Sequence, residues 1–328
     1  MTLLRGVRKL VKSVILSPIV LTPLVKLFRI CAITGQGSNQ CLKSGFLPLP
    51  VNYHSPVPDI KDLEERKIWD VRNELRGIDF REDAQLALLN EIGLDYSDEC
   101  QWPLLPTDNA SEFYVQNPSF SYGCAASTHC MIRYFKPSTF IEIGSGMSSR
   151  VISSALQMNR TRDGHDSAYV IVDPYPADVI TNGSIAFKKV IEIRVELLSP
   201  TFFDQLKSND ILFIDSGHCV RIGGDVNYLF LDILPRLESG VIVHIHDIAI
   251  PYEYPKAYAT SESFRQFWTA QYLLQSFLCF NKEFEVLLTM NYLMTDRSEC
   301  FKKSFPYYNP DIHPFISGSF WIRRKKRD

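Results

Sequence analysis

The stretch TFIEIGSGMSS, at residues 139–149, decides the fold. Residues 139–143 are a short apolar run of the kind that forms a buried strand, and helical spacing begins at 148 and continues to 158. Gly144 and Gly146 lie between them and allow the backbone to turn tightly and approach a ligand. A lone G-x-G is a weak signal, but its place between a strand and a helix favours a nucleotide-like ligand.

The same alternation continues along the chain. Apolar runs predict further strands at 168–172, 190–195, 210–214, 240–246, 285–290 and 317–323. Helical spacing predicts helices at 125–135, 148–158, 226–237 and 261–280. Continuous apolar strands separated by helices indicate a parallel α/β sheet with helices on both faces. The last two strands have only a loop between them, so we expect them to pair antiparallel.

Composition excludes several classes of protein. The chain has 328 residues, a net charge of −2, 45% hydrophobic and 22% charged residues, which excludes collagen-like, low-complexity and disordered chains. Thirty-five basic residues face 37 acidic ones, so there is no general attraction to nucleic acid, and the basic run 323–327 is interpreted as a solvated terminus. Eight cysteines without a CxxC pair indicate reduced thiols in a cytoplasmic protein. The oligomeric state stays open.

An N-terminal extension is expected over residues 1–110, ahead of a domain at 111–328. It would contain an apolar basic segment at 1–30, a loop at 31–60 and charged helices at 62–92. The first segment is too short for a membrane span, which needs about 20 apolar residues. Three interpretations stay open for it: a segment packed on the domain, a basic anchor at the membrane surface, or a cleaved signal peptide.

Polar residues follow the predicted strands at one edge of the sheet. In an open α/β sheet, ligands bind at the carboxyl ends of the strands. One glycine loop, three carboxylates and three imidazoles gather there: Glu142 to Ser149, Asp173, Asp215, His218, His244, His246 and Asp247. Asp173 can accept hydrogen bonds from ribose hydroxyls or cap a helix. His244 alternates with apolar residues and can be a core histidine, whereas His218 and His246 are candidates for chemistry.

The series FIEIGSGMSS, IVDPYP, ILFIDSGH and GVIVHIHDI resembles the class I S-adenosylmethionine-dependent methyltransferases. The likeness covers residues 45–328 and is nearest to a bacterial group within the methyltransferase 24 family. It implies a Rossmann-like, seven-stranded methyltransferase sheet with an antiparallel last strand. A dinucleotide-binding oxidoreductase would instead show G-x-G-x-x-G, and residue 149 is Ser where that pattern has Gly.

The resemblance also implies roles for the rim residues. Glu142, Gly144, Ser145 and Gly146 would hold the methionine part of S-adenosylmethionine, and Asp173 its ribose. Glu196, just after the predicted third strand, would lie on the adenine side. Asp215 would face the sulfonium on the cofactor side, and His218, His246 and Asp247 would form the catalytic acceptor pocket.

The histidines and carboxylates of the rim are candidates for a general base and for metal ligands. A neutral imidazole is suited to taking the proton of an acceptor hydroxyl near pH 7, so His218 or His246 is expected to be the general base, oriented by a carboxylate. Methyltransferases resembling catechol O-methyltransferase hold magnesium at positions that Asp215 and Asp247 would fill. Ile248 cannot ligate, and imidazole is softer than magnesium prefers. A divalent metal is therefore conceivable but not favoured.

The acceptor is expected to be a small polar, sugar or glycan-related hydroxyl compound, by analogy with the family. Tyr252, Glu253 and Tyr254 in the segment 250–255, and residues 113–122, would wall the pocket, or they would only pack the helix at 261–280. Two rival functions are a non-catalytic S-adenosylmethionine-binding or scaffolding protein and a nicotinamide-dependent oxidoreductase.

Overall fold

The computed structural model describes residues 17–262, 265–313 and 315–326. The chain divides into two compact units, residues 1–68 with 257–267 and residues 69–256 with 268–328. The unit that contains the sheet begins at Trp69 and so includes residues 69–110, which the sequence analysis assigns to the extension.

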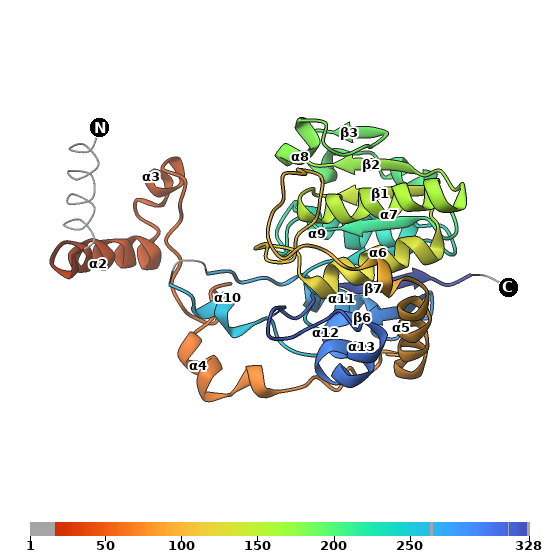
Figure 1. Cartoon of the computed structure of the whole chain (residues 1–328). Coiled ribbons are helices and arrows are strands. Elements are labelled where there is room, and N and C mark those ends of the chain that lie inside the picture. The colour runs from red at the N-terminus through yellow and green to blue at the C-terminus, as the bar shows by residue number, and fades with distance from the viewer. Residues whose placement is uncertain (1–16, 263–264, 314, 327–328) are drawn as a thin grey trace. The chain divides into compact units, whose positions relative to one another are not determined.

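The second unit is built on one seven-stranded sheet (Figure 1). The strand order is β3-β2-β1-β4-β5-β7-β6. The strands are β1 (Thr139–Ile143), β2 (Ala168–Val172), β3 (Lys189–Ile191), β4 (Ile211–Ile214), β5 (Ile242–Ile245), β6 (Phe284–Thr289) and β7 (Phe320–Arg324). β1 to β5 pair in parallel, whereas β7 pairs antiparallel with both β5 and β6. The order reverses between β1 and β4, which is where an open sheet binds its ligand.

Helices cover both faces of this sheet. α6 (Tyr122–Phe135) and α7 (Met147–Asp163) pack against each other on one face (Figure 1). The chain returns from β4 to β5 through a helical segment of α9 (Asp225–Asn227), η5 (Tyr228–Ile233) and η6 (Leu234–Arg236). The steps from β1 to β2 and from β4 to β5 run in opposite directions along the sheet. Parallel crossovers follow a right-handed rule, and under that rule the helices of these two steps lie on opposite faces.

Four further α-helices and several short helical turns complete this unit. α5 packs against β6, α6 and α13, and α11 packs against η5. Their bounds are α5 (Glu82–Tyr96), α11 (Ala270–Leu278), α12 (Met290–Thr295) and α13 (Ser298–Ser304), with short helical turns at η1 (Ile68–Asp70), η2 (Ser97–Glu99), α8 (Asp178–Thr181), η3 (Val195–Leu197) and η4 (Pro200–Gln205).

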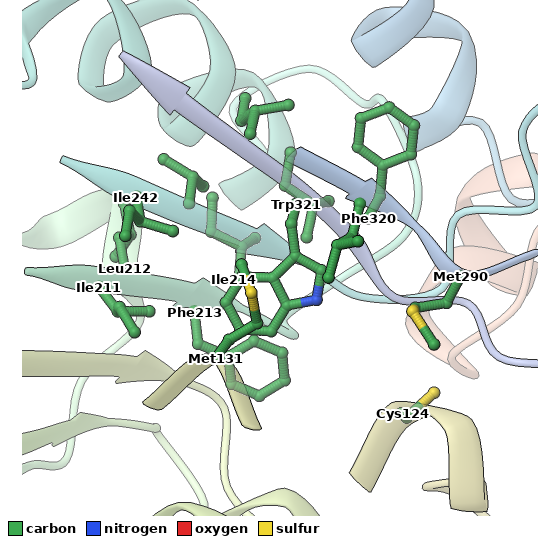
Figure 2. Close-up of a cluster of buried hydrophobic side chains, with 14 of the residues drawn as sticks. Cys124, Met131, Ile211, Leu212, Phe213, Ile214, Ile242, Met290, Phe320 and Trp321 are labelled. Carbon is green, nitrogen blue, oxygen red and sulfur yellow. The ribbon is translucent and has the colours of Figure 1, made fainter. Parts of the chain in front are cut away.

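The core lies between the sheet and these helices. Every residue of β4 and β5 is buried, as continuous apolar strands in a two-sided sheet require. Figure 2 shows the indole of Trp321 among the side chains of this cluster, and the Trp321 side chain is completely buried. His244 stacks on Trp321, with ring centroids 3.9 Å apart, so the expectation of a core histidine is confirmed.

A buried ion-pair network ties residues 97–100 to α6 and α7. Arg133, with 5% of its side chain exposed, donates to Glu99 (2.9 Å) and Asp163 (2.8 Å), while His129 Nε2 lies 2.8 Å from the same Glu99 carboxylate. Buried charges of this kind are stable only when paired and hydrogen-bonded. The network therefore makes Glu99, which precedes residue 110, part of the sheet-containing unit.

Several predicted elements need correction. β3 ends at Ile191 instead of 195, and the helix predicted at 261–280 begins only at Ala270. β6 and β7 are separated by α12 and α13 and not only by a loop, although their antiparallel pairing is confirmed. The predicted strand 317–323 and the predicted solvated tail 323–327 overlap at residue 323. Both 323 and 324 are in β7, where Arg323 pairs with Glu285 at 2.5 Å, so the tail interpretation fails for these two residues.

The first unit contains helices of its own. α2 (Pro18–Thr34) passes through Pro23, and α3 (Ser38–Lys43) lies in the region predicted as a loop. α4 (Ile60–Glu65) follows the cap residue Asp59, and α10 (Lys256–Thr260) starts at the boundary between the units. The predicted basic start of the chain, residues 1–16, lies outside the described residues. We find no helix in the described ranges with the length and apolar content that a membrane crossing needs.

Candidate active site

The glycine loop brings three strand ends together. Gly144 follows β1 with φ +97°, a conformation that favours glycine, and its N–H donates to Val172 O of β2 (3.0 Å). A Cβ built on Gly144 would overlap the carbonyl oxygen of Asp215, which follows β4. Asp215 N in turn donates to Ile143 O (2.9 Å). Only glycine therefore lets β1 and β4 approach this closely where the strand order reverses.

Ser145 and Asp173 meet on the other side of this loop. Ser145 Oγ donates to Asp173 Oδ2 (2.7 Å) and accepts from the N–H of Ala177 (3.0 Å). Asp173 Oδ1 accepts from the N–H of Tyr175 (2.8 Å). A carboxylate has about four acceptor positions, so Asp173 retains capacity for a ligand's hydroxyl groups.

Glu142 lies beneath the glycine loop and supports it. Its carboxylate is completely buried and accepts from Ser148 Oγ (2.7 Å), Ser149 Oγ (2.9 Å) and the Tyr169 hydroxyl. Burial raises the pKa of Glu142 to about 7, against the three hydroxyl groups, which favour its ionised form. These three hydrogen bonds anchor the start of α7. They occupy three of about four acceptor positions, and the contact of Glu142 with the methionine part of a ligand stays a prediction.

Gly146 belongs to the glycine loop, whereas Glu196 lies in a separate turn after β3. Gly146 N–H donates to Ser149 Oγ (3.0 Å), and a Cβ on Gly146 would meet nothing within 4 Å. Glu196 does not directly follow β3, because the strand ends five residues earlier, at Ile191. It lies in the turn η3, and its carboxylate is 3.3 Å from Arg194 Nε.

Two carboxylates and two imidazoles gather at the ends of β4 and β5. His246 Nδ1 lies 3.1 Å from Asp215 Oδ1 and 3.6 Å from Asp247 Oδ2. His218 Nε2 lies 3.3 Å from Asp247 Oδ2 and 3.9 Å from Asp215 Oδ1. The four residues, predicted from two separate motifs, therefore form one cluster.

The two imidazoles differ in environment. The His246 side chain is 3% exposed and that of His218 is 16% exposed. Burial acts to lower the pKa of His246, but the charges of Asp215 and Asp247 outweigh it and raise that pKa well above its ordinary value. Desolvation acts to raise the pKa of Asp215, yet His246 outweighs it and holds that pKa below its ordinary value.

Cys124 is a member of the site that sequence analysis missed. It lies in the first turn of α6, with its Sγ 3.2 Å from His246 Nε2 and 3.0 Å from Ser317 Oγ. Burial raises the pKa of this thiol, but the charge of His246 outweighs burial and brings it down to about 7. No sequence signal pointed to Cys124, because its partners are 122 and 193 residues away. All eight cysteines of the chain are free.

Trp268 is the second missed residue. Its ring centroid is 4.2 Å from that of His218. The backbone N–H groups of Thr269 (2.8 Å) and Ala270 (3.0 Å) donate to His218 O. Residues 268 and 269 precede α11 and are not helical, which is what allows this contact.

The residues predicted to wall the acceptor pocket mostly pack the protein. Tyr254 is 7% exposed and its hydroxyl accepts from Gln271 N (3.0 Å), while Glu253 accepts from the Tyr272 hydroxyl (2.6 Å). Tyr252 donates to Asp296 (2.5 Å). Asn117, 4% exposed, bonds only to the backbone of its own loop among the described residues. These contacts support the packing alternative.

The magnesium arrangement of the catechol type does not fit all of these residues. Ile248, which stands where that arrangement has a third oxygen ligand, is apolar and 1% exposed. An imidazole nitrogen lies beside the two carboxylates instead, because ligand atoms of Asp215, His246 and Asp247 are within 4.8 Å of one another. The donor set is one nitrogen and two oxygens.

Comparisons with known proteins agree with this architecture. A family described as a methyltransferase domain matches residues 141–248. An uncharacterised protein of Archaeoglobus fulgidus is 31% identical over 169 residues, which are 49% of this chain and 75% of that protein.

Two solved structures are also similar. The O-methyltransferase TomG from Streptomyces achromogenes, in complex with SAM, is 12% identical with a TM-score of 0.37, over 73% of this chain and 90% of that chain. SAH-bound PaMTH1, a methyltransferase of Podospora anserina, is 14% identical with a TM-score of 0.34, over 85% and 98%. Because both TM-scores are low, the fold assignment rests on the strand order of this chain and on the matched family. The chain belongs to the class I S-adenosylmethionine-dependent methyltransferases.

Proposed function

We propose that this protein transfers the methyl group of S-adenosylmethionine to a hydroxyl group of a small polar acceptor. The observation that carries the proposal is the contact of Gly144 with Asp215, which joins a loop suited to the donor to a cluster suited to the acceptor. Bound S-adenosylmethionine supplies an electrophilic methyl group, so the protein must align the acceptor and remove its proton.

The donor half comprises Gly144, Ser145, Gly146 and Asp173. Open space at Gly146 and the close turn at Gly144 let backbone N–H groups approach a ligand. Asp173 accepts the ribose hydroxyls, and Ser145 orients its carboxylate. Asp215 borders this half beside the sulfonium. Glu196 remains a candidate for the adenine side.

His218 is the general base of the acceptor half. It is more exposed than His246, and Asp247 lies 3.3 Å from its Nε2 and orients the ring. His246 is less suited, because Cys124 and Asp215 already engage its two nitrogens. During transfer, the acceptor oxygen forms a bond to the methyl carbon, the carbon–sulfur bond breaks and its electron pair stays on sulfur. The hydroxyl proton moves to His218 Nδ1, the ring nitrogen that does not face Asp247.

A sugar-like acceptor fits the side chain that lies next to this base. The Trp268 ring contacts that of His218 at a tilted angle of 46° and is only partly buried, so it can offer an aromatic face to the apolar side of a polar ring. The family analogy favours a sugar or glycan-related hydroxyl for the same position.

The test has two steps. Calorimetry with S-adenosylhomocysteine is expected to give one binding site, which Asp173→Ala weakens. Release of labelled methyl product is then measured on a panel of monosaccharides, sugar nucleotides and catechols. Binding without turnover on any acceptor would favour the non-catalytic alternative, and a rise of melting temperature with NAD but not with S-adenosylmethionine would contradict the proposal.

We propose further that this cytoplasmic enzyme contacts the surface of anionic membranes through its N-terminal segment. Residues 1–58 contain seven basic residues and no acidic one. No residue of α2 is buried, and nine large apolar side chains on it are exposed: Ile19, Val20, Leu21, Leu24, Val25, Leu27, Phe28, Ile30 and Ile33. Apolar surface together with basic charge is what binds a helix to an anionic lipid surface.

Vesicle sedimentation tests this contact. The protein should bind phosphatidylglycerol-containing vesicles and not pure phosphatidylcholine, and Lys26→Glu with Arg29→Glu should weaken binding at least tenfold. The matched control is Lys302→Glu with Lys303→Glu, two exposed lysines in the other unit. Equal loss in both double variants would contradict the assignment.

A further inference from the structure

We propose that Cys124 and Ser317 are positioning residues of the acceptor half, which hold the His246 ring and, through it, the carboxylate that orients the base. The inference rests on the proposed function, in which Asp247 orients His218. Cys124 is in the first turn of α6 (Figure 2), and Ser317 precedes β7. Two segments 193 residues apart in the chain thus meet at one sulfur atom.

The sulfur of Cys124 is a buried meeting point of three polar groups. The Cys124 residue is 2% exposed, and both His246 and Ser317 are buried as well. His246 Nε2 lies 3.2 Å from the sulfur, Ser121 Oγ donates to it over 3.2 Å, and Ser317 Oγ lies 3.0 Å away. Polar groups in a low-dielectric interior are stable only when they satisfy one another, so each member of this cluster depends on the others.

Both nitrogens of the His246 ring are engaged, and this selects one orientation of the ring. Nδ1 lies 3.1 Å from Asp215 Oδ1, and Nε2 lies 3.2 Å from Cys124 Sγ. Turning the ring over would place carbon atoms at both positions and leave buried polar partners without a hydrogen bond. The charges of Asp215 and Asp247 raise the pKa of His246, so Nε2 carries a proton and donates it to the sulfur. Cys124 therefore holds the ring on the side away from the carboxylates.

Asp247 connects His246 to the base. Its Oδ2 lies 3.6 Å from His246 Nδ1 and 3.3 Å from His218 Nε2. Asp247 has φ +57°, in the left-handed region, and a non-glycine residue depends on its surroundings to stay there. A change at Cys124 that lets the His246 ring move would therefore reach His218 through this one shared oxygen.

One short segment supports both ends of this series of contacts. Ser317 Oγ contacts Cys124 Sγ, and the next residue, Gly318, lies against Asp247. A Cβ on Gly318 would lie 2.8 Å from the Asp247 Cα, and Ile248 N donates to Gly318 O (2.9 Å). The segment leads into β7, which pairs with β5. The antiparallel end of the sheet therefore contributes to the acceptor half.

Cys130 supplies a matched control on the same helix. It is completely buried, and its sulfur lies 3.7 Å from that of Cys100. Cys130→Ala removes the same atom from α6 as Cys124→Ala does, and it leaves the sulfur beside His246 in place. An effect common to the two variants is therefore an effect of packing, whereas a difference between them reports the contact with His246.

Methyl-transfer kinetics test the positioning role. Cys124→Ala should lower kcat about 10- to 100-fold, because a small misplacement of a catalytic group is enough for such a loss. Cys124→Ser, whose hydroxyl can still accept from the His246 Nε2–H, should lower kcat less than about threefold. Cys130→Ala should leave kcat unchanged, and all three variants should bind S-adenosylhomocysteine within about twofold of the wild type. Ser317→Ala should lower kcat less than Cys124→Ala and add nothing to it in the double variant.

Nuclear magnetic resonance of ¹⁵N-histidine-labelled protein tests the same contact without an acceptor. The ring resonances of His246 are assigned by their loss in His246→Gln. The Nε2 resonance should shift in Cys124→Ala, shift less in Cys124→Ser and stay at its wild-type position in Cys130→Ala. Urea unfolding of each variant shows that it is folded.

The outcomes separate this role from the proposed function. A kcat of Cys124→Ala equal to that of the wild type, or an Nε2 resonance that Cys124→Ala does not move, would overturn the positioning role and leave the proposed function standing. Equal losses of kcat in Cys124→Ala and Cys130→Ala would also overturn it. Wild-type protein without methyl transfer on any acceptor, together with a shifted Nε2 resonance in Cys124→Ala, would contradict the proposed function and support the contact of Cys124 with His246.

Discussion

The two halves of the rim are constructed differently. The donor half, around Gly144, Ser145 and Asp173, consists of short turns directly after β1 and β2, and its hydrogen bonds join residues within one supersecondary unit. The acceptor half places His218 and His246 against Trp268 and Cys124, which come from distant segments. The donor half is thus encoded locally, while the acceptor half depends on how remote segments pack, and substitutions separate the two.

The largest effect is expected for Gly144→Ala, which breaks the contact between the halves. The new methyl group would overlap the Asp215 carbonyl and hold a non-glycine residue at positive φ. We expect destabilisation of about 3 kcal/mol or more, measured by urea unfolding. Gly146→Ala is the control, since its Cβ would meet nothing within 4 Å. Similar losses in both variants would contradict this account of Gly144.

His218→Ala tests the acceptor half alone. Removing a general base typically slows a reaction by about 10²–10⁴-fold. Methyl transfer should fall by that factor, while calorimetric binding of S-adenosylhomocysteine changes less than about twofold. If His246→Gln abolished the rise of the methyl-transfer rate with pH and His218→Ala did not, His246 would be the base instead.

Glu142→Gln tests how the buried carboxyl beneath the donor half affects the pH dependence of stability. The pKa of Glu142 is raised in the folded protein from 4.5 to about 7, so its contribution to stability is complete below pH 4.5 and is lost as pH rises toward 7. Across this pH window, the free energy of unfolding of the wild type should fall by up to about 3 kcal/mol relative to that of the variant. Unfolding free energies measured from pH 4 to 8 check it, and parallel curves for the two proteins would contradict it.

The smallest effect is expected at the outer edge of the donor half. Asp173→Ala removes the proposed acceptor of the ribose hydroxyls. Hydrogen bonds to charged groups contribute about 1.5–3 kcal/mol, so S-adenosylhomocysteine should bind at least tenfold more weakly. Glu196→Ala should change the dissociation constant less than threefold, because Arg194 already engages its carboxylate. Calorimetry distinguishes them, and a larger effect for Glu196 would assign it the adenine contact.

Local sequence was sufficient for much of the sheet. β1 and β2 have the predicted bounds, because a buried parallel strand is a continuous apolar run that ends sharply at glycine or at Asp173. The start of α11 was predicted nine residues too early, since helical periodicity does not reveal that Thr269 and Ala270 are held by His218 O. α12 and α13 were missed between the last two strands.

The site residues that follow the strands were predicted from local sequence, whereas those that depend on remote contacts were not. The rim residues after β4 and β5 were predicted because parallel strands place their carboxyl ends on one edge. The predicted role of Glu142 stays a prediction, because a motif position does not tell that its carboxylate is also held by the hydroxyls of Ser148 and Ser149. Cys124 and Trp268 were beyond prediction, since nothing in their neighbourhoods marks a partner over a hundred residues away or across a loop.

Gly318, which precedes β7, approaches Asp247 so closely that an added Cβ would lie 2.8 Å from the Asp247 Cα, and this contact has a practical consequence. The family match covers residues 141–248, so a fragment cut to it would retain nearly all of the motif residues and still lose the strand end that packs against Asp247. Cys124, which precedes the match, would be lost as well. Such a fragment would be a poor surrogate for the enzyme in ligand screening, and tags are better attached at the N-terminus than close to β7.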